Sequence, residues 1–153
     1  MRATLIPDMH TFACTQQQID RTFIVNALKL ELSTEKLNFV PNEPVIIKYA
    51  YTNTSKVALD LPTEPFVWTV RREDGKPVVE TPEGRRRKAP RGADTVVVSP
   101  AVGAGASLTH EETLSGLYVM NEPGAYFIRV EVAVPDGKGT AFIKSNMLRI
   151  TIK

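Results

Sequence analysis

The sequence predicts an all-β protein, an antiparallel β-sandwich of about seven to nine short strands without a disulfide. Apolar and polar residues alternate with a period of two in several segments, which is the pattern of strands with one buried face. Glycine, proline, asparagine and aspartate separate these segments at short intervals, as expected of the turns in a sandwich. No long segment shows the apolar period of an amphipathic helix.

The first half of the chain contains three strand signals, in residues 28–32, 45–51 and 66–70. The residues expected to face the core are Leu28, Leu30, Leu32, Val45, Ile47, Tyr49, Tyr51, Phe66, Trp68 and Val70. Two prolines and an asparagine between the first two segments predict a bend in the chain. Asp74-Gly75 lies between two β-rich runs and predicts a hairpin with a type I′ turn, which needs positive φ.

The second half begins with residues 82–94, predicted to be a loop because two prolines and two glycines flank five basic residues. A short strand is expected in 95–100, a flexible connection in 101–107 and a weakly patterned strand within 107–120. The residues expected to face the core from the last two strong segments are Tyr126, Ile128, Val130, Val132, Val134, Leu148, Ile150 and Ile152. We therefore expect residues 27–153 to form one sandwich domain after a poorly specified lead-in, 1–26.

Charge and cysteine content limit the functional classes. The 19 basic and 17 acidic residues give a formal charge of +2, too balanced to indicate nucleic acid or an anionic membrane as the main partner. Cys14 is the single cysteine, so an internal disulfide is impossible, and the role of Cys14 stays open. No apolar run approaches the roughly 18 residues of a membrane span. Pro7, Asp8 and His10 interrupt any signal-peptide apolar region.

The stretch Pro123-Gly124-x-Tyr126 resembles the tyrosine corner of immunoglobulin-like sandwiches, in which a tyrosine hydroxyl bonds back to the backbone upstream. Trp68 lies on a candidate strand where such domains often bury a tryptophan. Both are interpreted as structural residues. Ile128 stands where antibody domains have their second cysteine, so the antibody class is excluded but the sandwich is not.

The wider layout of about residues 28–153 is similar to bacterial immunoglobulin-like modules, among them the bacterial intracellular proteinase inhibitors and accessory domains of envelope and secreted proteins. The matching features are Asn53-Thr54-Ser55 at a strand end, the aromatic strand 66–70 and Asp74-Gly75-Lys76. The resemblance implies an immunoglobulin-like β-sandwich. It implies no inhibitory residues, because no reactive loop can be matched.

The basic run in 82–94 is the most conspicuous candidate site, a possible partner-binding loop. It comprises Arg85, Arg86, Arg87, Lys88 and Arg91. Arginine forks suit bidentate contacts to acidic or phosphate groups. Two alternatives remain open: a solvated loop that keeps the protein soluble, and a segment that attracts a trypsin-like protease as substrate or as inhibitory loop.

Four other patterns have both a structural and a functional interpretation. His110 and Glu112 share a strand face, but two histidines in the whole chain make a metal site a poor match. Asn53 matches a glycosylation sequon, although a turn explains it better. Tyr49, Tyr51, Phe66 and Trp68 are either core or an exposed aromatic strip. Phe127 and Phe142 lie opposite the core positions and would form an interaction patch if exposed together.

These patterns predict a non-catalytic binding or accessory module, of a bacterial envelope or secreted protein, that acts through loops or an exposed edge strand. The alternative is a proteinaceous protease inhibitor. No catalytic residue, cofactor or metal is predicted. The expected partner is an unidentified protein, and a periplasmic or extracellular location is favoured.

Overall fold

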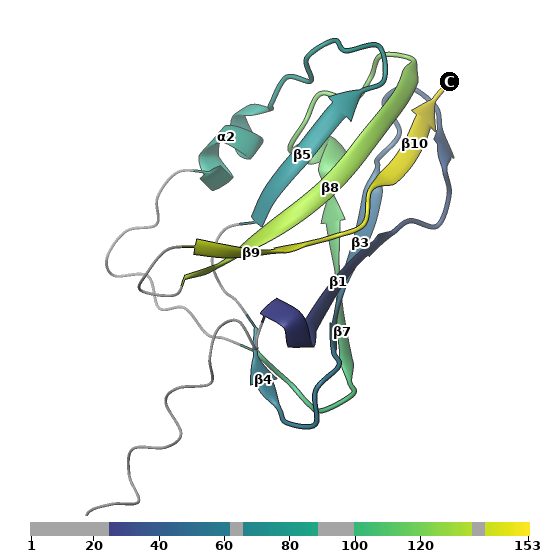
Figure 1. The fold of residues 1–153 in the computed structure, drawn as a ribbon. Helices are drawn as coiled ribbons and strands as arrows, with labels where there is room; N and C mark the ends of the chain where they lie inside the picture. The colour runs from purple at the N-terminus through teal and green to yellow at the C-terminus, as the bar shows by residue number, and fades with distance from the viewer. Residues whose placement is uncertain (1–24, 62–65, 89–99, 136–139) are drawn as a thin grey trace, which may run out of the picture.

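The computed structural model describes residues 25–61, 66–88, 100–135 and 140–153, which form the all-β sandwich that the sequence predicts (Figure 1). The described strands are β1 (Leu28–Ser33), β2 (Asn38–Phe39), β3 (Ile46–Asn53), β4 (Leu59–Asp60), β5 (Phe66–Arg72), β6 (Ala101–Val102), β7 (Ser107–Thr113), β8 (Gly124–Pro135), β9 (Thr140–Lys144) and β10 (Leu148–Ile152). A helix, α2 (Pro82–Lys88), and a 3-10 turn, η1 (Leu114–Gly116), accompany them.

The described strands form two main sheets. One has the order β1-β3-β7, and the other has the order β2-β10-β8-β5, with β9 also paired to β8. A small ladder joins β4 to β6. The ladders are antiparallel, except that β2 runs parallel to β10. The chain therefore changes sheet between β1 and β2, and it returns to the first sheet between β2 and β3, across the bend at the prolines.

The alternating apolar residues form the core, as predicted. Ile47 on β3, Ile128 and Val130 on β8, and Ile150 on β10 have no exposed surface. Tyr49, Phe66, Val70 and Leu148 are partly buried and pack against this core, and the side chain of Val134 lies outside the described residues. Burial of one such aliphatic side chain contributes about 1.5–3 kcal/mol, so the inward faces hold the two sheets together.

The predicted hairpin at Asp74-Gly75 is wrong. β5 pairs with β8 rather than with the residues that follow it. The Gly75 amide donates to the Arg72 carbonyl at 3.2 Å, and Gly75 has φ +76° whereas Asp74 does not have positive φ. A type I′ hairpin turn needs positive φ at both central residues. The Asp-Gly pair instead ends β5 and leads the chain away from its sheet.

Side chains cap the edges of two outer strands. The Asn146 carboxamide pairs with β1: its Oδ1 accepts from the Leu32 amide at 2.7 Å and its Nδ2 donates to the Leu32 carbonyl at 3.2 Å. On β5, the Trp68 carbonyl accepts from the Tyr118 hydroxyl at 3.1 Å. Unpaired edge groups are the part of a sheet that recruits another strand. These caps occupy them at one point on each edge.

Candidate partner-binding site

The predicted loop 82–94 begins with a helix, so the loop prediction is wrong for residues 82–88. The Thr81 hydroxyl accepts from the Gly84 amide at 3.0 Å and donates to the Gly116 carbonyl at 2.6 Å. Pro82 is the first residue of α2, where its missing N–H costs nothing. Threonine followed by proline is a helix-start signal. The prolines and glycines of the segment favoured a loop instead, so the sequence did not predict this helix. Residues 89–94, including Arg91, lie outside the described residues.

Most of the basic side chains on α2 pair within the protein. Arg86 makes two hydrogen bonds of 2.8 Å to Glu83. Arg87 bonds to Glu83 at 3.0 Å and to Glu112 of β7 at 2.7 Å. Lys88 pairs with the Glu80 carboxylate, and Arg85 donates to the Glu80 carbonyl at 2.8 Å. The structure thus brings four of the five predicted residues together, but three of them are used in ion pairs, and those of Arg87 and Lys88 attach α2 to residues outside the helix.

The helical backbone also bears on the inhibitor hypothesis. A segment that enters a partner as an added strand must be extended, and residues 82–88 are helical. The inhibitor hypothesis therefore receives no support from this part of the basic run and stays a prediction.

The ion pairs of α2 predict an acid-sensitive contribution to stability. Hydrogen bonds from Arg86 and then Arg87 lower the pKa of Glu83 to about 2. Because this folded-state pKa lies below the ordinary value of 4.5, the ionised carboxylate stabilises the fold above pH 4.5. The contribution is lost as the pH falls toward 2. Urea unfolding between pH 2 and 6 should show a weaker pH dependence for Glu83→Gln than for the wild type.

The control for that experiment is Glu31→Gln, which removes one carboxylate from β1, far from α2, where Glu31 pairs with Lys29 of the same strand at 2.8 Å. Identical pH dependences for the wild type and Glu83→Gln would contradict a stabilising role for the α2 ion pairs.

Tyr126 has the geometry of a tyrosine corner. Its side chain is 1% exposed, and its hydroxyl donates to the Glu122 carbonyl at 2.8 Å. Gly124 has φ +139°, a conformation that favours glycine, and a Cβ there would lie 3.4 Å from Arg72. The Pro-Gly-x-Tyr stretch therefore has a physical reason for two of its residues: glycine allows the turn, and tyrosine ties the start of β8 back to it.

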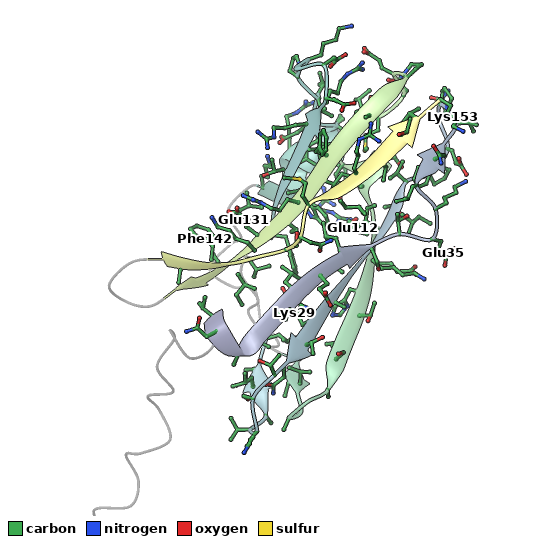
Figure 2. All side chains as sticks on the ribbon, turned by 45° about the vertical axis from the view of Figure 1, so that its right-hand side comes forward. Lys29, Glu35, Glu112, Glu131, Phe142 and Lys153 are labelled. Atoms are coloured by element: carbon green, nitrogen blue, oxygen red, sulfur yellow. The ribbon has the colours of Figure 1, made fainter. Side chains whose placement is uncertain are left out.

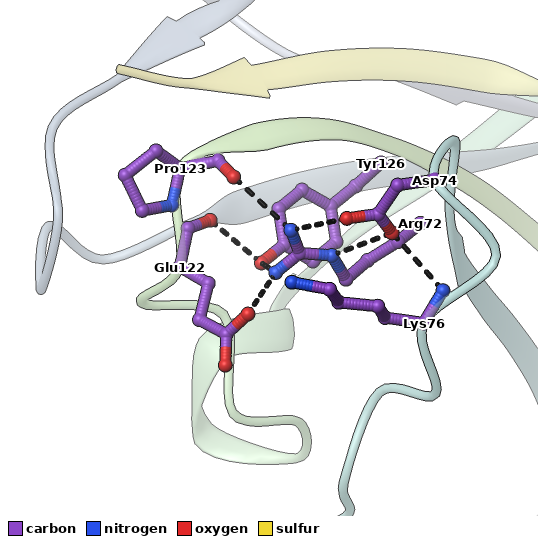
Figure 3. Close-up of polar contacts among 6 residues, drawn as sticks. All are labelled: Arg72, Asp74, Lys76, Glu122, Pro123 and Tyr126. Atoms are coloured by element: carbon purple, nitrogen blue, oxygen red, sulfur yellow. Dashed lines mark hydrogen bonds and ion pairs between the residues drawn. The ribbon is translucent and has the colours of Figure 1, made fainter.

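Arg72 closes this corner, as Figure 3 shows. Its guanidinium lies over the Tyr126 ring, 5.5 Å from the centroid. It forms a two-pronged pair with Asp74, Nε to Oδ1 at 3.0 Å and Nη2 to Oδ2 at 2.7 Å, and it also pairs with Glu122. The pair holds the pKa of Asp74 below its usual value, mainly through the hydrogen bond from Arg72.

A shallow depression beside this corner is lined by Arg72, Glu73, Asp74, Pro123, Gly124 and Ala125. Arg72 is only 8% exposed there, and its donors go to Asp74, Glu122 and the Pro123 carbonyl. The charged groups that a ligand would need are thus engaged with one another. The arrangement joins the end of β5 to the start of β8.

Removal of one tyrosine hydroxyl is expected to destabilise the protein at Tyr126 and not at Tyr51. Tyr126→Phe deletes the bond to Glu122 and should lower the free energy of unfolding by about 1 kcal/mol. Tyr51 is 1% exposed, and its hydroxyl has no hydrogen-bond partner in the described structure. Tyr51→Phe should therefore be neutral or stabilising by up to about 1 kcal/mol. Denaturant titration of both variants tests this, and equal losses would contradict it.

The outer face of the sheet formed by β5, β8, β9 and β10 collects exposed and half-buried side chains, Phe127 and Arg129 among the half-buried ones, that the sequence analysis did not group. Phe127 lies in register between Arg71 of β5 and Arg149 of β10. The next outward residue of β8 is Arg129, opposite Thr69. The third is Glu131, which lies between Val67 and Lys144 and pairs with Arg129 at 3.0 Å. We call this set the outer face.

The outer face carries more basic than acidic residues. It holds four basic residues, Arg71, Arg129, Lys144 and Arg149, against Glu131 and, at its end, Glu73. The side chains of Lys144 and Arg149 are 58% and 54% exposed. Each of these cations occupies a polar position of the strand alternation, so its outward direction can be predicted from the sequence. Their proximity cannot, because it depends on the register of four strands.

Phe127 and Phe142 do lie on this same face, but they do not form one patch. Phe142 is 40% exposed and pairs in register with Ala133. Ala133 lies six positions after Phe127 on β8, about 20 Å along a strand. Figure 2 shows Phe142 and Glu131 near the region where β8 and β9 pair. Phe127 and Phe142 therefore lie toward opposite ends of the outer face, with Arg129 and Glu131 between them.

The other predicted patterns have structural explanations. His110 stacks on Tyr49 with ring centroids 5.3 Å apart, while Glu112 pairs with Arg87. Within the described ranges, no group of three His, Cys, Asp or Glu side chains is placed to hold a metal. Tyr51 and Trp68 are buried. Tyr49 and Phe66 are half-buried, and their ring centroids are 5.1 Å apart. The core interpretation of these aromatic residues is thus confirmed.

Asn53 of the possible sequon is completely buried. Its Nδ2 donates to the carbonyls of Val57 and Val102 at 2.7 and 3.1 Å. Its Oδ1 accepts from the amide and the hydroxyl of Ser55 at 2.9 and 2.7 Å. Both ends of the amide are engaged, so the turn interpretation is confirmed and the folded chain has no room for a glycan at Asn53.

Comparison with known proteins adds no assignment: the chain matches no protein-family model and no curated protein sequence. Among the described helices, none is long and apolar enough to cross a membrane.

Proposed function

We propose that this protein is a non-catalytic binding module of the immunoglobulin-like type, and that it binds a protein partner through the outer face. Three features of the fold support the immunoglobulin-like class. Tyr126 on the central strand β8 makes the corner bond, and Trp68 lies buried on the neighbouring β5. The chain also divides its first strands, β1 and β2, between the two sheets.

The single observation that supports the binding surface is the composition of the outer face. Protein interfaces are enriched in arginine and aromatic side chains, and binding energy concentrates in such residues. The outer face has three arginines around Phe127, with Val67 and Phe142 exposed at 43% and 40% toward its other end. A face with these side chains resembles an interface more than it resembles an ordinary solvated sheet.

Two alternative surfaces are less suited to this role. The edges of β1 and β5 are capped by Asn146 and Tyr118, so a partner strand would have to displace a side chain at each. The cations of α2 are engaged with Glu80, Glu83 and Glu112, so a partner would have to replace existing ion pairs. On the outer face, Arg71 has no carboxylate partner among the described residues, and Arg149 has one exposed ion pair, with Glu73 at 3.2 Å, so a partner displaces at most this weak pair to reach both arginines.

Position-specific photo-crosslinking tests the proposal. A benzophenone amino acid is placed at Thr69, on the outer face opposite Arg129, or at Thr109, on β7 of the other sheet. In cells that make the protein, irradiation should give a discrete adduct from Thr69 and not from Thr109. Adducts of equal yield from both positions, or none from Thr69, would contradict a binding role for the outer face.

A further inference from the structure

We infer that the partner of the outer face is an acidic protein segment, with carboxylates on both sides of an apolar side chain that contacts Phe127. The inference rests on the proposed function and specifies its partner. It starts from the row Arg71, Phe127 and Arg149, which three neighbouring strands place side by side.

The spacing of this row determines how far apart the carboxylates of a partner must be to reach Arg71 and Arg149 together. Neighbouring strands lie about 4.8 Å apart, so the Cα atoms of Arg71 and Arg149 are about 10 Å apart with Phe127 between them. Arg71 is exposed and has no carboxylate partner among the described residues, and Arg149 has a single contact of 3.2 Å to an exposed Glu73. Exposed ion pairs of this kind contribute little, so an incoming carboxylate can replace Glu73 at small cost.

The charge pattern favours a protein over a polyanion. Glu131 stands inside the face, between Val67 and Lys144, and bonds to Arg129. Nucleic acid and anionic lipid present continuous negative charge, which Glu131 and Glu73 would repel. A folded or helical protein segment can place carboxylates opposite the arginines and a neutral or basic group opposite Glu131, which is the complementarity found across protein interfaces.

The test uses a displayed library of random 15-residue peptides, selected against the intact protein at low salt. Peptides are retained if they bind the wild type and not Phe127→Ala. The inference predicts that retained peptides contain at least two Asp or Glu residues flanking an apolar residue. It also predicts that their affinity falls as salt is raised, because the contacts at the arginines are exposed.

Charge-reversal variants measure the role of the row. The double variant Arg71→Glu with Arg149→Glu should weaken the retained peptides at least about tenfold. The matched control, Lys29→Glu with Lys48→Glu, makes the same change in net charge on β1 and β3 of the other sheet and should stay within about twofold. Circular dichroism of both variants verifies that each is folded.

Each other outcome overturns a different statement. Retained peptides that are neutral or basic would overturn the acidic partner and leave the outer face as a binding surface. No peptide with Phe127-dependent binding would overturn the proposed function as well. A single-stranded DNA 20-mer or phosphatidylserine vesicles that bind through Arg71 and Arg149, while acidic peptides do not, would overturn the inference in favour of a polyanion.

Discussion

Asn53→Ala is expected to lower the free energy of unfolding by about 3 kcal/mol, one of the two largest losses predicted for a single substitution in this protein. The Asn53 amide is fully buried and connects the end of β3 to the turn at Ser55–Val57 and to β6 at Val102. Alanine would take the Asn53 partner from the buried Val102 carbonyl and from the part-buried Ser55 amide, each at a cost of about 1–3 kcal/mol, and would add a cavity.

Urea denaturation followed by the fluorescence of Trp68 measures this loss. Asn121→Ala is the matched control, because Asn121 is exposed, and such surface changes usually stay within about 0.5 kcal/mol. Asn53→Asp should also be destabilising, since it keeps the acceptor for Ser55 but loses both donated bonds. If Asn53→Ala unfolded at the same urea concentration as Asn121→Ala, the buried amide would have no structural role.

Gly84→Ala is expected to destabilise the protein by about 2 kcal/mol, opposite in sign to the usual effect of this change in a helix. Alanine normally stabilises a helix interior relative to glycine by about 1 kcal/mol. In α2, however, a Cβ on Gly84 would lie 2.2 Å from the Leu117 carbonyl oxygen. A backbone atom cannot rotate away, so the helix or the segment after η1 must shift, and overpacking of this kind typically costs 1–3 kcal/mol.

Gly116→Ala is the control for this prediction, because a Cβ at Gly116 meets no atom within 4 Å. Thermal unfolding measures the overall loss. Limited trypsin digestion at the basic run of α2 reports on the helix itself, since a displaced α2 exposes Arg85, Arg86 and Arg87 to cleavage. Faster cleavage is expected in Gly84→Ala alone, and unchanged stability and cleavage would show that α2 does not pack against Leu117 as described.

The sequence was sufficient to predict the fold because the period-two pattern is a local property. The residues facing inward on β1, β3, β8 and β10 follow directly from it. Turn geometry at Asp74-Gly75 was predicted incorrectly because the turn type depends on which strand β5 pairs with, and that partner is β8, more than 50 residues away. Strands β2, β4 and β6 have two residues each, too few to show a period.

The candidate site could be predicted only in part. The basic run was visible, but the ion pair of Arg87 with Glu112 requires the fold to bring β7 beside α2. The outward position of Phe127 followed from the alternation of β8. Its position between Arg71 and Arg149 did not, because that row exists only in the register of three strands, two of which come from opposite halves of the chain.

The central claim is that the outer face binds a partner while the cations of α2 serve the fold. The most direct measurement is the yield of the Thr69 photo-crosslink in two double variants, Arg71→Glu with Arg149→Glu and Arg85→Glu with Arg86→Glu. The outer-face variant should lose the adduct, and the α2 variant should keep it if it remains folded by circular dichroism. An adduct that survives the outer-face variant and disappears in a folded α2 variant would assign binding to α2 and contradict this account.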